Sequence, residues 1–171
     1  MKVYNTIITW LFIVVFIGGV FLCYINFAKC LYYKAYDGEV IGDPIYVGKP
    51  PKANDVLVDI AERTGCRYNV VFEDMEDGGY TRLLSGTIHL KQGLDTASLV
   101  WCYTHEIMHH KCFTKNDLYV QVETFKFLYE CGDVYYKYVA ELILSNMDKM
   151  SDQYNAQYYI YAYLEGRDEN I

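Results

Sequence analysis

Two histidines and a glutamate, His105, Glu106 and His109, occur in the order H-E-x-x-H. On an α-helix, residues four apart lie on one face, so both imidazoles can bind the same metal ion. Glu106 is turned by about 100° from His105, close enough to hold a water molecule bound to that ion. The pattern predicts a zinc (Zn2+) centre with Glu106 as the general base. The alternative is a polar helix face on which both histidines bind nothing.

A catalytic zinc ion usually has three protein ligands and leaves a fourth position for water. The longer motif H-E-x-x-H-x-x-G-x-x-H would supply the third ligand itself, but Cys112 and Lys115 stand where it requires glycine and histidine. That class of zinc enzyme is therefore excluded. The remaining candidates for the third ligand are carboxylates on the helix that is expected to follow.

The rise of an α-helix distinguishes these carboxylates. If one helix ends near Cys112 and an antiparallel helix begins near Asp117, then Glu123 lies about 9 Å into the second helix, level with both histidines. Asp117 lies at the corner itself, and Glu130 lies about 19 Å in, beyond the histidines. Glu123 is therefore the predicted third ligand. The alternative for Glu123 is an exposed side chain paired with Lys126.

The elements that must position these residues follow from hydrophobic and capping patterns. A helix capped by Asn54 and closed near Gly65 is expected first, and the run RYNVVFE predicts a strand over 67–73. A second strand is expected over 82–91, after an acidic turn that contains a glycine pair. Four helices should follow, over residues 95–112, 117–131, 133–147 and 151–165. This order indicates the α+β class, with a short sheet followed by several helices.

Two motifs resemble those of the ImmA/IrrE-type metallopeptidases. The first joins Gly86–Leu90 (GTIHL) to His105–His110 (HEIMHH), and the second is Val122–Leu128 (VETFKFL). The resemblance covers about residues 53–130. It implies a small zincin-like domain of the gluzincin kind.

In that family the first motif supplies two zinc-binding histidines and the general base, and the second motif supplies the third ligand. The resemblance thus implies zinc binding by His105, His109 and Glu123, and proton transfer by Glu106. This ligand set agrees with the one that the helix geometry favours.

The predicted activity is hydrolysis of peptide bonds in a protein or peptide substrate by water that zinc activates. Residues 86–91 could bind an extended peptide by β-augmentation. Tyr80, His89 and Tyr119 are candidates for stabilising the charge that develops on the carbonyl oxygen. Two alternatives stay open. One is a zinc amidase that uses Cys66 as a ligand, and the other is a non-enzymatic membrane regulatory or immunity protein with a degenerate zincin fold.

The N-terminal part differs from the rest of the chain, because residues 3–28 carry no charged side chain. As a helix they would extend about 39 Å, more than the bilayer core of about 30 Å, which predicts a single-pass transmembrane anchor. A cleaved signal peptide is the alternative. Residues 36–51 contain all three prolines and are expected to be a linker. The metallopeptidase domain would then occupy residues 52–171, and the sequence predicts that it lies on the cytoplasmic side.

Composition limits the other function classes. The chain has 171 residues, 15 of them basic and 22 acidic, which gives a net charge of −7. That balance argues against binding of nucleic acid, which requires clustered lysine and arginine. The six cysteines form no C-x-x-C pair, so they fit thiols as well as disulfides.

Overall fold

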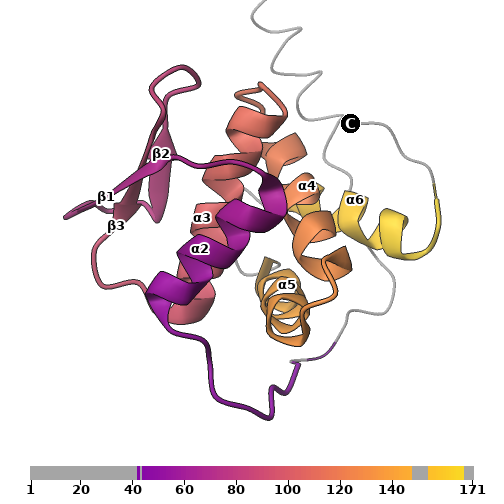
Figure 1. Cartoon of the computed structure of the whole chain (residues 1–171). Coiled ribbons are helices and arrows are strands. Elements are labelled where there is room, and N and C mark those ends of the chain that lie inside the picture. The colour runs from indigo at the N-terminus through magenta and orange to yellow at the C-terminus, as the bar shows by residue number, and fades with distance from the viewer. Residues whose placement is uncertain (1–41, 43, 148–153, 168–171) are drawn as a thin grey trace, which may run out of the picture. The chain divides into compact units, whose positions relative to one another are not determined.

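The structure is a computed structural model that describes residues 42, 44–147 and 154–167 (Figure 1). These residues belong to one compact unit. The predicted anchor at residues 3–28 and most of the first half of the predicted linker at residues 36–51 lie outside the described residues. The boundaries between the N-terminal segment, the linker and the domain therefore stay a prediction.

The predicted localisation as a single-pass membrane protein is contradicted. Within the described part of the chain, no helix combines the length and the apolar character that crossing a bilayer requires. Residues 3–28, on which that prediction rested, lie outside this part. The membrane assignment, and with it the cytoplasmic placement of the domain, is corrected accordingly.

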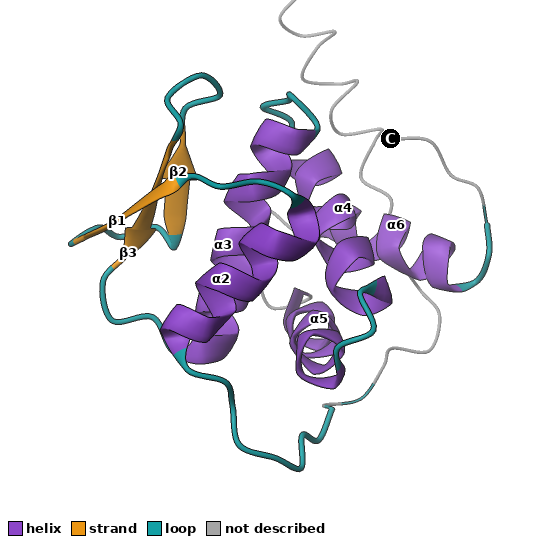
Figure 2. Cartoon of the chain, in the orientation of Figure 1, coloured by secondary structure: helices purple, strands orange, loops and turns teal. Residues whose placement is uncertain are grey.

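The described residues form an α+β fold of helices and one small sheet, as the sequence predicts at this level (Figure 2). Of the helices in the described residues, α2 comes before the sheet and the others follow it, and the strands are short. The elements are α2 (Ala53–Thr64), β1 (Asn69–Glu73), β2 (Gly79–Thr81), β3 (Thr87–Lys91), α3 (Thr96–Lys111), α4 (Asp117–Glu130), α5 (Val134–Asn146) and α6 (Tyr154–Leu164).

Strand β3 is the centre of the sheet, whose order is β1-β3-β2. It runs parallel to β1, with Val71 opposite His89, and antiparallel to β2, with Tyr80 opposite the same histidine. Its side chains alternate, so Ile88 and Leu90 are buried while His89 lies on the other face. One face of the sheet therefore packs into the core, and β1 and β2 form its two edges.

The strand that was predicted over 82–91 is only partly extended. Ser85 donates its backbone N–H to the carbonyl oxygen of Arg82 at 2.8 Å, and Gly86 has a φ of 63°. These residues make the turn between β2 and β3. Because β3 is paired on both sides, the β-augmentation predicted for residues 86–91 is wrong. Strand β2, which the sequence did not indicate, has an edge that is free within the sheet.

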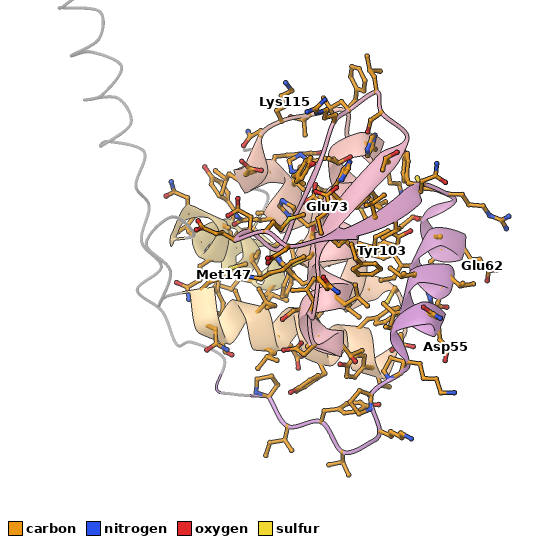
Figure 3. All side chains as sticks on the ribbon, turned by 90° about the vertical axis from the view of Figure 1, so that its left-hand side faces the viewer. Asp55, Glu62, Glu73, Tyr103, Lys115 and Met147 are labelled. Carbon is orange, nitrogen blue, oxygen red and sulfur yellow. The ribbon has the colours of Figure 1, made fainter. Side chains whose placement is uncertain are left out.

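Helix α3 lies between the sheet and the other helices (Figure 1). It contacts α2, α4 and α5 as well as β2 and β3, and its buried residues include Leu99, Tyr103 and Ile107. In Figure 3 the buried Tyr103 lies among the side chains of the interior, whereas Lys115 lies at the periphery. Because α3 is held from several sides, the H-E-x-x-H motif that it carries has a fixed position.

Side-chain caps explain where α3, α4 and α5 begin. Asp95 accepts the N–H of Ser98 and begins α3, and Asn116 accepts the N–H of Tyr119 and begins α4. The cap of α4 is thus one residue earlier than Asp117, which the sequence suggested. At the end of α2, Gly65 adopts a left-handed conformation with a φ of 70°.

Replacing Asp133 by alanine should lower the free energy of unfolding by about 1–2 kcal/mol, because its carboxylate caps α5. Oδ1 of Asp133 accepts the backbone N–H groups of Tyr135 at 2.8 Å and Tyr136 at 3.1 Å. Urea denaturation followed by circular dichroism measures the change. Asp133→Asn keeps an acceptor and should lose much less. An equal loss in both variants would instead implicate the contact of Asp133 with Arg63 at 3.9 Å.

Candidate metal centre

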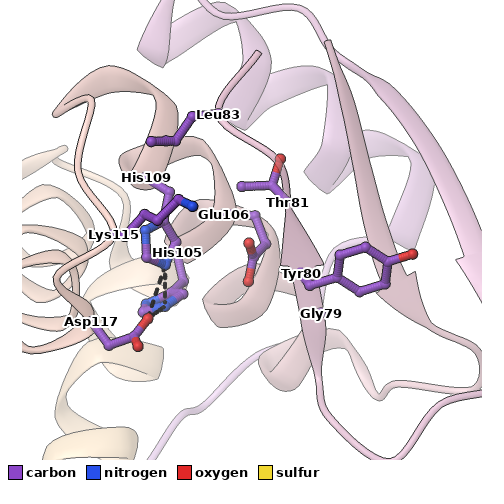
Figure 4. A pocket seen from close by; sticks show the side chains of 9 residues that line it. All are labelled: Gly79, Tyr80, Thr81, Leu83, His105, Glu106, His109, Lys115 and Asp117. Atoms are coloured by element: carbon purple, nitrogen blue, oxygen red, sulfur yellow. Dashed lines mark hydrogen bonds and ion pairs between the residues drawn. The ribbon is translucent and has the colours of Figure 1, made fainter. Parts of the chain in front are cut away.

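Three potential metal ligands come together from two helices. His105 and His109 lie about one turn apart on α3, and Asp117 is the first residue of α4. Their Nε2 atoms are 3.2 Å apart, and Oδ1 of Asp117 lies 3.1 Å from Nε2 of His109 and 3.8 Å from Nε2 of His105. Figure 4 shows the three side chains converging on one point. No other group of three metal-binding side chains this close occurs among the described residues.

The connection between the two helices, residues 112–116, folds back beside His109. Phe113 has a φ of 49°, and the N–H of Thr114 donates to the carbonyl oxygen of His109 at 3.2 Å. The cap at Asn116 then starts α4. As a result, Asp117 lies next to the two histidines.

The ring of His109 is oriented by the same connection. Nδ1 of His109 lies 2.8 Å from the carbonyl oxygen of Thr114. A carbonyl oxygen only accepts, so Nδ1 carries the proton and donates it, which leaves the lone pair of the neutral ring on Nε2. Metal-binding histidines usually make such a bond through the nitrogen that does not face the metal. Nδ1 of His109 is therefore turned away from the cluster and Nε2 toward it, as in a metal-binding histidine.

His105 is held in its neutral form. Burial, and to a smaller extent the neighbouring His109, lowers the pKa of His105 to about 4. Its ring is therefore uncharged at neutral pH, as metal binding requires. Its buried Nδ1 has no hydrogen-bond partner among the described residues.

The donor atoms and their spacing fit a zinc ion. Tetrahedral zinc with bonds of about 2.0–2.1 Å requires ligand atoms about 3.3 Å apart, and the three separations here are 3.1, 3.2 and 3.8 Å. Two imidazole nitrogens and one carboxylate oxygen are a ligand set that catalytic zinc sites use. The side chain of Asp117 is 74% exposed, so solvent reaches the cluster from that side.

Glu106 lies beside the cluster, with 5% of its surface exposed. Burial, and secondarily the carboxylate of Asp117, raises the pKa of Glu106 to about 7. In Figure 4 its carboxylate lies between the histidines and strand β2. The predicted general base thus lines the cavity that extends from the cluster to strand β2.

A cavity of about 380 Å³ extends from the cluster to strand β2. Helices α3 and α4 and the segment between them form one side, and β2 with the turn after it forms the other. Lys115 is the only lysine or arginine in the lining. The lining residues are Gly79, Tyr80, Thr81, Leu83, His105, Glu106, His109, Lys115 and Asp117.

Strand β2 is held close to α3 by two features. A Cβ atom on Gly79 would lie 2.9 Å from Cδ2 of Leu90 and 3.0 Å from the carbonyl oxygen of His89, so a side chain there would push β2 away from β3, and it would come within 3.4 Å of Cγ of Glu106. At the end of β2, Oγ1 of Thr81 lies 2.5 Å from Nε2 of His110, whose ring stacks on Tyr68. His110, which directly follows the motif, therefore connects α3 to the cavity's other wall.

The structure differs from the prediction at the third ligand. Glu123 lies outside both the cluster and the cavity lining, and its Oε1 is 3.0 Å from Nζ of Lys126. This pairing is the alternative that the sequence left open. The prediction placed Asp117 at the corner between the two helices because it treated the connection as a point, whereas residues 112–116 bring Asp117 back to the histidines. We therefore assign Asp117 in place of Glu123 as the candidate third ligand.

The other residues suggested from sequence are not directed at the cluster. The ring of Tyr80 points away from the cavity in Figure 4 and stacks on His89, with centroids 4.5 Å apart. His89 contacts Glu73 Oε1 at 2.7 Å, and neither it nor Tyr119 lines the cavity. Cys66 is not in the metal cluster either. Lys115, which the sequence used only to exclude a longer motif, is the lining residue that was overlooked.

Comparisons with known proteins add little to this geometry. No protein-family model matches the chain, and no curated protein matches it significantly. Among solved structures, the crystal structure of the metallopeptidase zymogen of Pyrococcus abyssi abylysin is similar, with 13% identity and a TM-score of 0.35 over 70% of this chain and 100% of that chain. A likeness this distant establishes neither a common fold nor a common activity. The similarity to ImmA/IrrE-type enzymes remains a resemblance of motifs.

Replacing Asp117 by alanine should weaken zinc binding by more than about tenfold, because one of three ligands is lost. Glu123→Ala removes the carboxylate predicted from the sequence and should leave zinc binding unchanged. Competition with a chromophoric chelator measures both affinities, and elemental analysis of the purified protein identifies the metal. Loss of zinc from the Glu123 variant alone would show that Asp117 is not the ligand.

Proposed function

We propose that this chain is a zinc-dependent hydrolase of peptide bonds. The observation that carries the proposal is the convergence of His105, His109 and Asp117 within 4.8 Å of one another, with the buried carboxylate of Glu106 beside them in the same cavity. A metal site that only stabilises the fold is usually closed by four protein ligands. Three ligands on an open cavity are instead typical of a catalytic site.

When bound, zinc supplies a Lewis acid that lowers the pKa of a water ligand and polarises a carbonyl group. Glu106 accepts the proton of the attacking water and transfers it to the nitrogen of the leaving amine. Its raised pKa suits this role, because a carboxylate in a buried position holds a proton more strongly than an exposed one. The amide bond is broken between the carbonyl carbon and that nitrogen.

A peptide substrate is supported by strand β2. Gly79, Tyr80 and Thr81 line the cavity, and β2 pairs with β3 on one side only. The free edge of β2 thus offers backbone N–H and C=O groups along one wall of the cavity. An extended peptide that paired with this edge would lie across the opposite wall, where the candidate ligands are.

We propose that Lys115 stabilises the negative charge that develops on the carbonyl oxygen of the substrate in the transition state. It is the only lysine or arginine of the cavity lining, and it makes no hydrogen bond or ion pair with a described residue. Figure 4 shows its side chain extending from the helix connection over His109 toward Thr81 and Leu83. A cation in that place stabilises an oxyanion more than it stabilises the neutral carbonyl, so it lowers the barrier.

Glu106→Gln should lower peptide hydrolysis by at least about 100-fold, because the amide has almost the same shape but cannot accept the proton. Zinc content should stay the same, since Glu106 is not a ligand. Cleavage of dye-quenched casein by the zinc-loaded full chain measures the activity. A wild-type protein that binds zinc but cleaves no unfolded protein or peptide library would favour the non-enzymatic alternative.

Lys115→Met should reduce kcat by about 10- to 100-fold with little change in KM, and Lys115→Arg should recover part of the loss. The change falls on kcat because the charge acts mainly in the transition state. Lys137→Met, which removes an exposed lysine on α5, is the matched control. A rise in KM at constant kcat would assign Lys115 to substrate binding instead.

A further inference from the structure

The first strand of the sheet leaves one side of its backbone unpaired within the described residues. β1 is an edge of the sheet. The N–H of Asn69 donates to Gly86 at 3.0 Å and the carbonyl oxygen of Glu73 accepts from Gln92 at 2.8 Å, both toward β3. In a strand, successive backbone groups point to opposite sides, so the N–H and C=O groups of Val70 and Phe72 point away from β3. These groups can pair with another strand.

This edge lacks the features that usually prevent pairing between molecules. Its five residues, NVVFE, include no proline and no lysine, and the strand is paired with β3 along its whole length without a bulge. Phe72 is 46% exposed and Val71 is 40% exposed. The opposite edge, β2, has only three residues and borders the cavity. β1 is therefore the longer and more apolar of the two edges.

A groove of about 390 Å³ lies beside β1, between this strand and helix α2. Leu57, Val58 and Ala61 of α2 line one side, and Val70 lines the other. Val58 is 58% exposed although it lies on a helix that packs against α3. In Figure 3, Tyr103, which also lines the groove, lies between the strand that carries Glu73 and the helix that carries Glu62. A further strand that paired with the free edge of β1 would lie over this groove and would cover the exposed part of α2.

The charges around β1 favour a second copy of the chain as the partner that pairs with this edge. In a two-fold, antiparallel pairing centred on Val70, Arg67 of each copy lies opposite Glu73 of the other, and Tyr68 lies opposite Phe72. Arg67 makes no ion pair or hydrogen bond with a described residue. Glu73 contacts His89 through Oε1 and keeps 40% of its side chain exposed. The pairing thus forms two contacts between Arg67 and Glu73, which have opposite charges, and two contacts between the aromatic rings of Tyr68 and Phe72.

We propose that two copies of this chain associate through their β1 strands and form one continuous six-stranded sheet. The residue opposite Val70 is then Val70 of the second copy, and the groove beside α2 is covered by the added strand. The two cavities lie at the other edge of each sheet and stay open. This inference does not depend on the proposed peptidase activity, because none of its residues belongs to the metal centre.

Sedimentation equilibrium of the full chain, carried out over a range of protein concentrations, tests the proposal. The wild type should form dimers. Arg67→Glu places like charges opposite each other twice and should raise the dimer dissociation constant by at least about tenfold. The combined change Arg67→Glu with Glu73→Arg restores opposite charges and should recover most of the affinity. Arg82→Glu, which changes an exposed arginine outside the strand by the same amount of charge, should have no effect.

Four results would overturn the proposal. One is a wild type that stays monomeric at every concentration, and another is a dimer that Arg67→Glu leaves unchanged. The third is that the combined variant, Arg67→Glu with Glu73→Arg, keeps the wild-type circular dichroism spectrum and unfolding midpoint but does not recover the dimer. Association with a different protein in place of a second copy would overturn it as well.

Discussion

The candidate metal centre depends on the point at which helix α4 begins. The two histidines are brought together by the period of a single helix, but the carboxylate has to come from another element. Residues 112–116 determine its position, because Thr114 contacts both the backbone and the ring of His109. The same segment therefore places Asp117, orients the imidazole of His109 and decides which of its nitrogens is free. A change in this short connection would affect all three properties together.

The parts of the fold that sequence could predict are those that a local pattern determines. Helix α3 was expected over 95–112 and is found over Thr96–Lys111, because Asp95 caps it and apolar residues continue along it. The histidine pair was predictable for the same reason, since its geometry needs only the helical repeat. Strand β2 was missed because three residues that begin with glycine carry too little β-propensity to be distinguished from a turn. Its pairing with β3 is a tertiary interaction.

The position of Asp117 beside the histidines could not be derived because the helix connection has no regular geometry. Counting the rise along two helices placed Glu123 level with the histidines and Asp117 at the corner. The actual path includes Phe113 in a left-handed conformation, which a bulky residue seldom adopts and which no local signal indicates. The available clue was chain distance, because Asp117 is the first carboxylate after His109. The acidic side chain nearest to the motif is the one that the structure brings to the histidines.

The exposure of Asp117 has a consequence for how the ion arrives. His105 and His109 belong to a helix that the apolar core holds in place, whereas the carboxylate stands at the rim with solvent on one side. In the proposed zinc enzyme, an ion would therefore enter from the solvent side, past the carboxylate of Asp117, and meet two imidazoles that the core already holds in place. Of the three candidate ligands, the aspartate is the one that an incoming or departing ion would pass.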